Sequence, residues 1–213
     1  MSGTGIVVFG AGGHAKVVID LLFCLGGYEV RVVDDDPRKA GAELLGVRVE
    51  GSCEDAAGLV RRGVQEAVIA LGDNARREEM GLRAAGFGFR LPALVHPRAV
   101  VSAHARIGDG TVVFAGGIVA ADAVVGRFGI VNHGASVDHD CVLGDAVHIA
   151  PGARLAGNVA VGRRSTIGIG ARILPGRRVG EGCIVGAAAC VVGDIPDGVV
   201  VTGVPAKILR NNR

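Results

Sequence analysis

Aliphatic residues recur every six positions from Val101 to Val191 without interruption. Small residues stand four places after many of them, as at Ala105, Thr111, Gly117, Ala123, Gly129, Ala135, Cys141, Ala153 and Ser165. A period of six matches neither the 3.6-residue turn of an α-helix nor the two-residue alternation of a strand. It predicts a parallel β-helix, in which each hexad forms one short side of a coil and directs its aliphatic residue inward.

Three hexads per coil would give this solenoid an 18-residue spacing rule. Residues 18 apart would lie directly above one another, about 4.8 Å apart, which is the separation of hydrogen-bonded strands. The rule therefore predicts which side chains on successive coils are neighbours.

The first hundred residues follow a different pattern, in which short apolar runs alternate with helical stretches. We expect strands at 6–9, 30–33, 67–71 and 87–91, and helices at 15–25, 54–62 and 75–85. This alternation predicts a small, Rossmann-like parallel sheet with helices on its faces. Pro92, His96 and Pro97 mark the boundary, so we expect an α/β domain over residues 1–95 and a β-helix with a basic tail over 96–213.

Composition is consistent with a narrow solenoid and excludes several function classes. The 213 residues include 36 glycines and only 3% aromatics, too little bulk for an ordinary globular core. No run approaches the roughly 20 apolar residues of a membrane span, and no basic-then-apolar leader opens the chain. The net charge of +2 is spread out and predicts no nucleic-acid interface.

The cysteines indicate a reducing compartment. Five are present, with no CxxC pair, and Cys141 and Cys183 occupy the small-residue position of their hexads. Buried thiols in a cytoplasmic protein are the expected reading of this distribution.

Residues 10–15 (Gly-Ala-Gly-Gly-His-Ala) fit the pattern G-x-G-x-x-A between a strand and a helix. Such glycines let the backbone approach a diphosphate at the helix N-terminus, and His14 and Lys16 would reinforce an anion site. Asp34 and Asp35 follow about twenty residues later, where an acidic residue can meet a ribose hydroxyl or a base edge. Only half of a dinucleotide fold precedes the solenoid, which favours a mononucleotide diphosphate over a dehydrogenase cofactor. The alternative is a purely structural tight turn.

His139 is the candidate base. It stands at the third place of its hexad, where a side chain leaves the coil, and Asp140 can hydrogen-bond one ring nitrogen and raise the basicity of the other. Gly157 lies 18 residues on, so the spacing rule places it one coil above the imidazole with its N–H open to a developing oxyanion. A base, its orienting carboxylate and an oxyanion donor together predict an acyl-transfer site.

A histidine–metal site is the competing interpretation, because His133, His139 and His148 fall within one coil. His133 and His139 are six residues apart, which places them on different faces of the prism. No carboxylates are obviously placed to orient three ligands. We therefore expect no metal.

Together with residues 203–207 (Gly-Val-Pro-Ala-Lys), the hexads resemble those of bacterial hexapeptide acyltransferases, whose coil is left-handed. Residues 10–16, 34–37, 72–74 and 138–141 narrow the resemblance, over the whole chain, to nucleotide-sugar 4-N-acetyltransferases of surface-glycan pathways. Sialic-acid O-acetyltransferases share much of this pattern. The resemblance implies a homotrimer with acetyl-CoA between neighbouring solenoids and a nucleotide-linked amino sugar held by the N-terminal domain.

The resemblance also implies residue roles. His139 would be the catalytic base, Asp140 its partner (a Glu in some relatives) and Gly157 the oxyanion donor. Cofactor contacts would come from His148, Ile169 and Ala187, and Lys207, Arg210 and Arg213 would attract the cofactor's phosphates unless they form a solvated basic end. The substrate contacts would be Gly10, Gly12, Gly13, His14, Lys16, Asp34, Asp35, Gly72, Asn74 and Asn132.

The resulting hypothesis is acetyl transfer from acetyl-CoA to the 4-amino group of an NDP-4-amino-4,6-dideoxyhexose. Three alternatives stay open: a sugar O-acetyltransferase of the sialic-acid type, a non-catalytic nucleotide-sugar-binding scaffold, and a metal-dependent hydratase. The sequence does not distinguish between uracil, guanine and thymine as the base.

Overall fold

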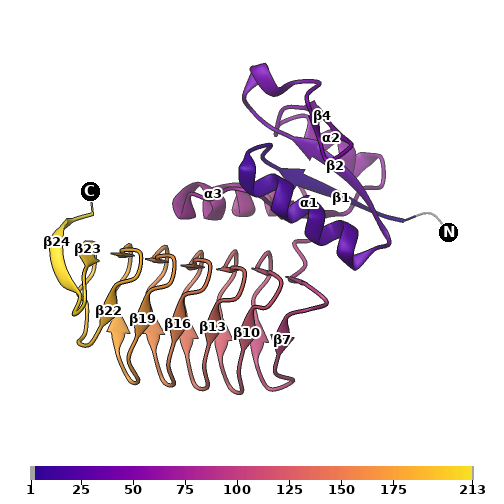
Figure 1. Cartoon of the computed structure of the whole chain (residues 1–213). Coiled ribbons are helices and arrows are strands. Elements are labelled where there is room, and N and C mark those ends of the chain that lie inside the picture. The colour runs from indigo at the N-terminus through magenta and orange to yellow at the C-terminus, as the bar shows by residue number, and fades with distance from the viewer. Residues whose placement is uncertain (1–2, 213) are drawn as a thin grey trace. The chain divides into compact units, whose positions relative to one another are not determined.

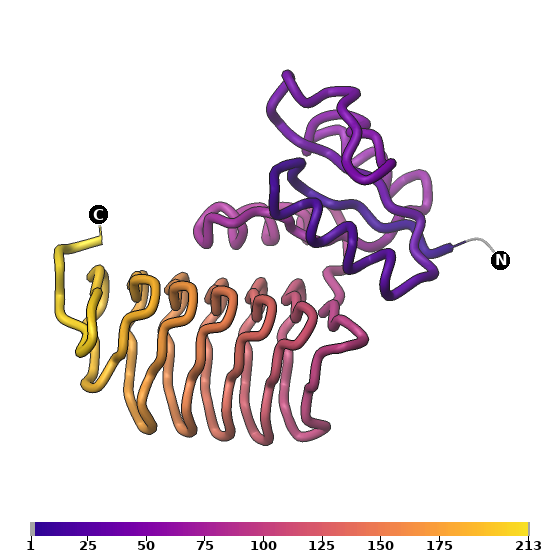
Figure 2. The backbone as a smooth tube through the Cα atoms, viewed as in Figure 1, coloured from indigo at the N-terminus to yellow at the C-terminus, as the bar shows by residue number. Residues whose placement is uncertain are grey.

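The structure is a computed structural model that describes residues 3–212 (Figures 1 and 2). The chain divides into two compact units, Met1–Pro92 and Ala93–Arg213. Within residues 3–212 no helix has both the length and the apolar character needed to cross a membrane.

The N-terminal unit contains a five-stranded sheet in the order β3-β4-β2-β1-β5. Four strands run parallel: β1 (Thr4–Phe9), β2 (Tyr28–Val33), β4 (Val47–Gly51) and β5 (Glu66–Ile69). The helices are α1 (Gly13–Leu25), α2 (Ala56–Arg61) and α3 (Asn74–Gly86), with a short 3-10 turn, η1, at Pro37–Lys39. Ile6, Val7, Val8 and Phe9 are all fully buried, as expected for a central parallel strand covered on both faces.

Two local expectations differ from the structure. The strand expected at 87–91 is wrong: Gly88 turns the chain with a φ of 97° immediately after α3, and only Arg90 forms an isolated bridge, to Glu66. The apolar pattern there reflects Phe89, whose ring packs edge-on against Phe9 at 5.8 Å. The antiparallel hairpin of β3 (Glu43–Leu44) and β4 was not expected, because Leu45 occupies a turn position with a φ of 49° that usually carries Asn or Gly.

The C-terminal unit is a three-sided parallel solenoid, whose successive coils are visible in Figure 1. Sheet I contains β7 (Val100–Val101), β10 (Ile118–Val119), β13 (Ser136–Val137), β16 (Arg154–Leu155), β19 (Arg172–Ile173) and β22 (Cys190–Val191). Sheet II contains β8 (Arg106–Ile107), β11 (Val124–Val125), β14 (Val142–Leu143), β17 (Ala160–Val161) and β20 (Arg178–Val179). Sheet III contains β6 (Leu94–Val95), β9 (Val112–Val113), β12 (Ile130–Val131), β15 (His148–Ile149), β18 (Thr166–Ile167), β21 (Ile184–Val185), β23 (Val199–Thr202) and β24 (Lys207–Asn211).

The strand register confirms the 18-residue rule. Ile118 pairs with Ser136, and Ser136 pairs with Arg154, each 18 residues apart. The hexad aliphatics point inward, with Val131, Ile149 and Ile167 among those fully buried. Neighbouring coils therefore present equivalent hexad positions one above the other.

Two buried hydroxyl groups occupy the small-residue position, and each forms hydrogen bonds with a backbone carbonyl and a backbone N–H of the coil. Ser165 donates to the Gly180 carbonyl at 2.7 Å and accepts from the Cys183 N–H at 2.8 Å. Thr111 makes the equivalent bonds to Gly126 and Gly129. A polar residue in this core is compatible with packing because both of its hydrogen-bonding capacities are used.

The solenoid continues beyond the last hexad. β23 extends sheet III with Ile184 opposite Val200, an offset of 16 rather than 18, and β24 then runs back antiparallel to it. Most of the expected basic tail, including Lys207 and Arg210, is therefore an exposed edge strand.

Candidate active site

His139 lies in the turn that follows β13, and it is exposed to solvent. Its Nδ1 lies 2.7 Å from Oδ2 of Asp140, and its backbone N–H donates to Asp138 Oδ1 at 2.7 Å. Because a carboxylate only accepts, Nδ1 carries the proton and Nε2 is left as the basic nitrogen. The hydrogen bond to Asp140 raises the pKa of His139 above its ordinary value, aided by the charges of Asp138 and Asp140.

Gly157 lies against this imidazole, one coil farther along, where the 18-residue rule places it. A Cβ built on Gly157 would be 2.5 Å from Nε2 of His139, so no other residue fits without moving the ring. The two coils are joined here by a hydrogen bond from the Asn158 N–H to the His139 carbonyl at 2.9 Å. Within residues 3–212, no group accepts a hydrogen bond from the Gly157 N–H. The imidazole of His139 therefore packs against a residue whose backbone N–H is available.

A second polar cluster lies on sheet III. Asn132 Oδ1 accepts from the His133 backbone N–H and from His133 Nδ1, both at 2.9 Å. Its Nδ2 lies 3.1 Å from His148 Nε2, and the His133 ring stacks on Phe114 at 5.0 Å. A backbone N–H can only donate, so Oδ1 must face His133 and Nδ2–H must donate to His148. With Nε2 accepting this hydrogen bond, His148 carries its ring proton on Nδ1.

The three histidines of the coil do not converge. His133 is bonded to Asn132 on the sheet III side, whereas His139 is bonded to Asp140 at the turn after sheet I. Across the described part of the chain, no three His, Cys, Asp or Glu side chains are grouped so that they could hold a metal ion.

The expected cofactor residues lie on the side of sheet III. Ile169 and Ala187 are exposed in the turns after β18 and β21, 18 residues apart, in the same column as His133. Ile169 leaves 62% of its surface exposed. Lys207 is exposed in β24. These residues lie on the same side of the solenoid as His148 and Asn132, whereas His139 lies at the turn after sheet I.

The N-terminal unit contains a cavity of about 490 Å³ at the carboxyl ends of its parallel strands. Phe9 and Gly10 at the end of β1, Asp34–Asp36 after β2, and Leu71 after β5 line it, together with Lys39 and Cys53. Ligands bind in such crevices of open α/β sheets.

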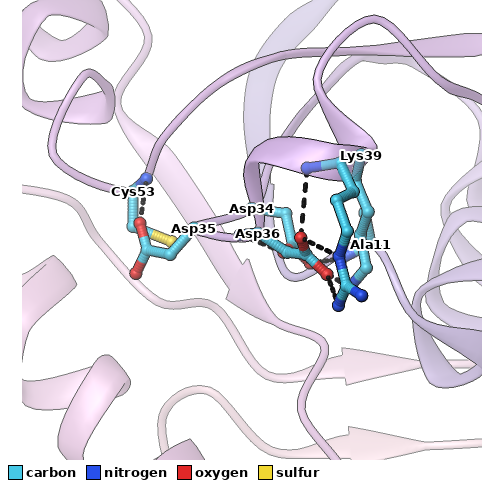
Figure 3. A network of polar contacts seen from close by, with 7 residues as sticks. Ala11, Asp34, Asp35, Asp36, Lys39 and Cys53 are labelled. Carbon is cyan, nitrogen blue, oxygen red and sulfur yellow. Dashed lines mark hydrogen bonds and ion pairs between the residues drawn. The ribbon is translucent and has the colours of Figure 1, made fainter.

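Asp34 is held by three donors. Its Oδ2 accepts from the Ala11 N–H at 2.6 Å and from Lys39 Nζ at 2.8 Å, and its Oδ1 accepts from the Asp36 N–H at 2.9 Å (Figure 3). Partial burial acts to raise the pKa of Asp34, but these hydrogen bonds and the Lys39 charge lower it below its ordinary value. Asp34 therefore fastens the glycine turn to the loop after β2.

Asp35 and Asp36 are held differently. Asp35 accepts from the Cys53 N–H at 2.8 Å and lies beside the Cys53 side chain (Figure 3). Burial, with the Asp35 charge next in size, raises the pKa of the Cys53 thiol to about 12. Asp36 binds the exposed Arg38 through both of its oxygens. Within residues 3–212, no cation pairs with Asp35, which is the exposed carboxylate of this loop.

The glycines of the turn have different reasons to be glycine. At Gly10 the φ of 107° is one that residues with a side chain rarely adopt, and a Cβ would also lie 3.1 Å from the Ala70 carbonyl oxygen, so the backbone conformation favours glycine. Gly12 and Gly13 have nothing within 4 Å of such a Cβ, and within residues 3–212 neither N–H donates a hydrogen bond. Gly72 is similarly open, Lys16 is exposed and His14 is half-buried.

Asn74 is placed away from the solvent. It is 9% exposed, and its Oδ1 accepts from Arg77 Nη2 at 2.7 Å. Arg77, 1% exposed, also donates to the carbonyls of Leu71 and Gly72, and burial lowers its pKa to about 10. Through the hydrogen bonds of Arg77 to these two carbonyls, the pair stabilises the turn after β5.

Sequence reasoning missed one wall of the cavity, which is formed by Arg76, Glu79, Met80 and Arg83 of α3. Their spacing of i, i+3, i+4 and i+7 places them on one helix face. Because three of these four residues are charged, their sequence pattern is also typical of a helix face exposed to solvent. The signal that could have revealed it is its position directly after the third strand, at the binding edge of the sheet.

Comparison with known proteins gives consistent matches over both units. Residues 5–81 match the family model of the PglD N-terminal domain. The chain is similar to perosamine N-acetyltransferase from Caulobacter crescentus, solved as a histidine-to-asparagine variant with CoA and GDP-perosamine, at 46% identity, 96% coverage of each chain and a TM-score of 0.92. It is also similar to the acetyltransferase domain of PglB from Neisseria gonorrhoeae, in complex with acetyl coenzyme A, at 43% identity, 97% and 100% coverage and a TM-score of 0.91.

A curated relative gives a partial match. UDP-N-acetylbacillosamine N-acetyltransferase of Bacillus subtilis is 35% identical over 115 residues, so the matched segment spans about half of each protein, 52% of this chain and 51% of that relative. The full-length structural matches confirm the predicted fold class, an α/β domain followed by a left-handed parallel β-helix.

Proposed function

The chain belongs to the nucleotide-sugar N-acetyltransferases of the left-handed β-helix superfamily, and we propose that it acetylates the 4-amino group of a nucleotide-linked 4-amino-4,6-dideoxyhexose. Acetyl-CoA is the donor. The observation that carries this assignment is the position of Gly157 against the imidazole of His139. The product is an N-acetylated nucleotide sugar for bacterial surface-glycan biosynthesis.

The site residues supply a base and an oxyanion donor to this reaction. The substrate amine attacks the thioester carbonyl, Nε2 of His139 takes a proton from the nitrogen, and the Gly157 N–H donates to the oxyanion. Collapse of the tetrahedral intermediate breaks the C–S bond, and the proton on His139 passes to the departing thiolate. Asp140 stabilises the imidazolium between these steps. General-base catalysis of this kind contributes about 10²–10⁴-fold.

The active enzyme is proposed to be a homotrimer with its active sites between neighbouring solenoids. The support is that His139 and the cluster of Asn132 and His148 lie on different sides of one prism. In this arrangement His148, Ile169 and Ala187 of one protomer line the pantetheine path to the His139 of another. Lys207 attracts the cofactor's phosphates, and Asn132 faces the sugar.

The cavity of the N-terminal unit is proposed to hold the nucleotide. Gly10, Gly12 and Gly13 bring the backbone close to the diphosphate, and Asp35 meets the nucleoside. His14, Lys16, Gly72 and Asn74 complete or shape this edge. Because acetyl-CoA and nucleotide sugars are made in the cytoplasm, we place the reaction there.

Release of the CoA thiol tests the reaction directly. The protein is incubated with acetyl-CoA and GDP-, UDP- or dTDP-linked 4-amino-4,6-dideoxyhexoses, and free thiol is measured with a chromogenic disulfide. We expect release with an amino sugar and none with its 4-hydroxy counterpart. Release only with free or nucleotide-linked sialic acid would instead identify an O-acetyltransferase, and sugar binding without release would identify a scaffold.

A further inference from the structure

Charge pairing around the cavity of the N-terminal unit leaves one cation without an acid, and we propose that this residue, Arg76, binds the diphosphate of the nucleotide. The inference rests on the proposed function of the cavity. It adds a residue that no sequence motif marked.

Three cations line the cavity, and two of them are neutralised. Lys39 Nζ lies 2.8 Å from Asp34 Oδ2. Arg83 pairs with Glu54, and its guanidinium lies 5.6 Å from the centre of the Phe87 ring. Within residues 3–212, the guanidinium of Arg76 has no hydrogen bond or ion pair. Arg76 is therefore the cation that can accept an anionic partner without breaking an existing pair.

The position of Arg76 in the fold matches that of the open backbone donors. β1 and β5 are adjacent parallel strands, and the chain leaves their carboxyl ends at Gly10 and Leu71, which both line the cavity. The backbone N–H of Arg76 donates to Asp73 Oδ1 at 2.8 Å, which fixes Arg76 in the first turn of α3. The segment that carries Arg76 therefore follows the same edge of the sheet as the segment that carries Gly12 and Gly13.

The donors at this edge select a ligand rich in acceptors. The Ala11 N–H is already used by Asp34, but those of Gly12 and Gly13 are open, as described above. Two backbone donors and a guanidinium suit a diphosphate, whose oxygens accept several charge-assisted hydrogen bonds. The nucleoside and the amino sugar offer no comparable anion.

Glu79 provides a matched control. It lies on the same face of α3, lines the same cavity and carries the opposite charge. If Arg76 acted only through the general field of the cavity, Glu79→Gln would strengthen diphosphate binding about as much as Arg76→Gln weakens it. A direct contact instead gives a larger effect for Arg76 and only partial rescue by Arg76→Lys, because lysine lacks the planar fork.

Calorimetric titration of the full chain with GDP, UDP and dTDP and with the corresponding nucleosides tests the inference. We expect Arg76→Gln to weaken binding of the preferred diphosphate about tenfold or more and to leave nucleoside binding unchanged. Equal diphosphate affinity in wild type and Arg76→Gln, or equal and opposite effects of Arg76→Gln and Glu79→Gln, would overturn it while leaving the proposed function intact. Binding of none of the three diphosphates by the wild type would overturn both.

Discussion

The backbone of Gly157 packs against the imidazole of His139 from the next coil, so that a side-chain methyl there would lie 2.5 Å from Nε2. The same position is occupied by Ala121 one coil before His139 and by Pro175 one coil after Gly157. The column therefore accepts side chains where no histidine lies beneath them. Glycine at 157 reflects the imidazole rather than the turn.

Gly157→Ala is expected to displace the His139 ring and lower kcat about 10²-fold or more, because the base loses its alignment. Gly193→Ala, at the equivalent position two coils farther on, has open space for its methyl and should keep wild-type activity. Steady-state kinetics on both variants, with thermal melts, make the comparison. Similar kcat values for the two variants would contradict the proposed geometry.

The pH profile of kcat/KM should report the His139–Asp140 pair. A base works in its neutral form, so activity falls as the pH drops through the pKa of His139, which Asp140 raises. Asp140→Asn removes the main cause of this elevation. The acidic limb should therefore move to lower pH, while kcat falls because the Nδ1 proton loses its carboxylate partner. An unmoved limb would assign the titration to another group.

Asp34 should couple folding to pH. The pKa of Asp34 is lowered in the folded state. Its contribution to the free energy of unfolding is therefore fully present above the pKa that Asp34 has in the unfolded chain, and it is lost as the pH falls through the pKa of the folded state. Asp34→Asn should cost about 1–3 kcal/mol of unfolding free energy at neutral pH, and the difference from wild type should vanish in acid. Denaturant titrations at several pH values measure it. Asp36→Asn, which breaks an exposed pair with Arg38, should change little.

The amide of Asn132 should set the tautomer of His148. In the wild type the proton lies on Nδ1, because Nε2 accepts from Asn132. Asn132→Asp replaces that donor with a carboxylate, so the proton should move to Nε2. Long-range ¹H–¹⁵N NMR of the imidazoles distinguishes the two tautomers. A wild-type spectrum with the proton on Nε2 would refute the assignment, and His133→Ala provides a control that leaves the Asn132–His148 contact in place.

The solenoid could be predicted to the level of single contacts, whereas the N-terminal unit could not. A strict period fixes the neighbour of every residue, so the distance from His139 to Gly157 in sequence implied their contact. The α/β unit has no such rule. The charges that its cavity offers to a ligand depend on which side chains form ion pairs in the folded protein, as Lys39 does with Asp34.

This difference explains where the structure of the N-terminal unit departs from what the sequence led us to expect. The 43–51 hairpin was missed because Leu45 adopts a left-handed conformation that its residue type rarely shows. Asn74 was expected to face the ligand, yet the structure turns it toward the buried Arg77, a contact that depends on tertiary packing. Its role as a substrate contact stays a prediction.

Mixing two variants that we expect to be inactive tests whether the active site is shared between protomers. His139→Ala and His148→Ala each remove one side of the proposed site, and in a homotrimer the two sides come from different chains. If the proteins are denatured together and refolded at equal ratio, an interface is complete when His139 comes from one variant and His148 from the other. Random assembly gives about a quarter of the interfaces this composition. Thiol release should therefore recover to about a quarter of the wild-type rate, whereas the double variant refolded alone stays inactive. If both histidines served a site within a single chain, no mixture could restore activity, and the shared-site arrangement would be wrong.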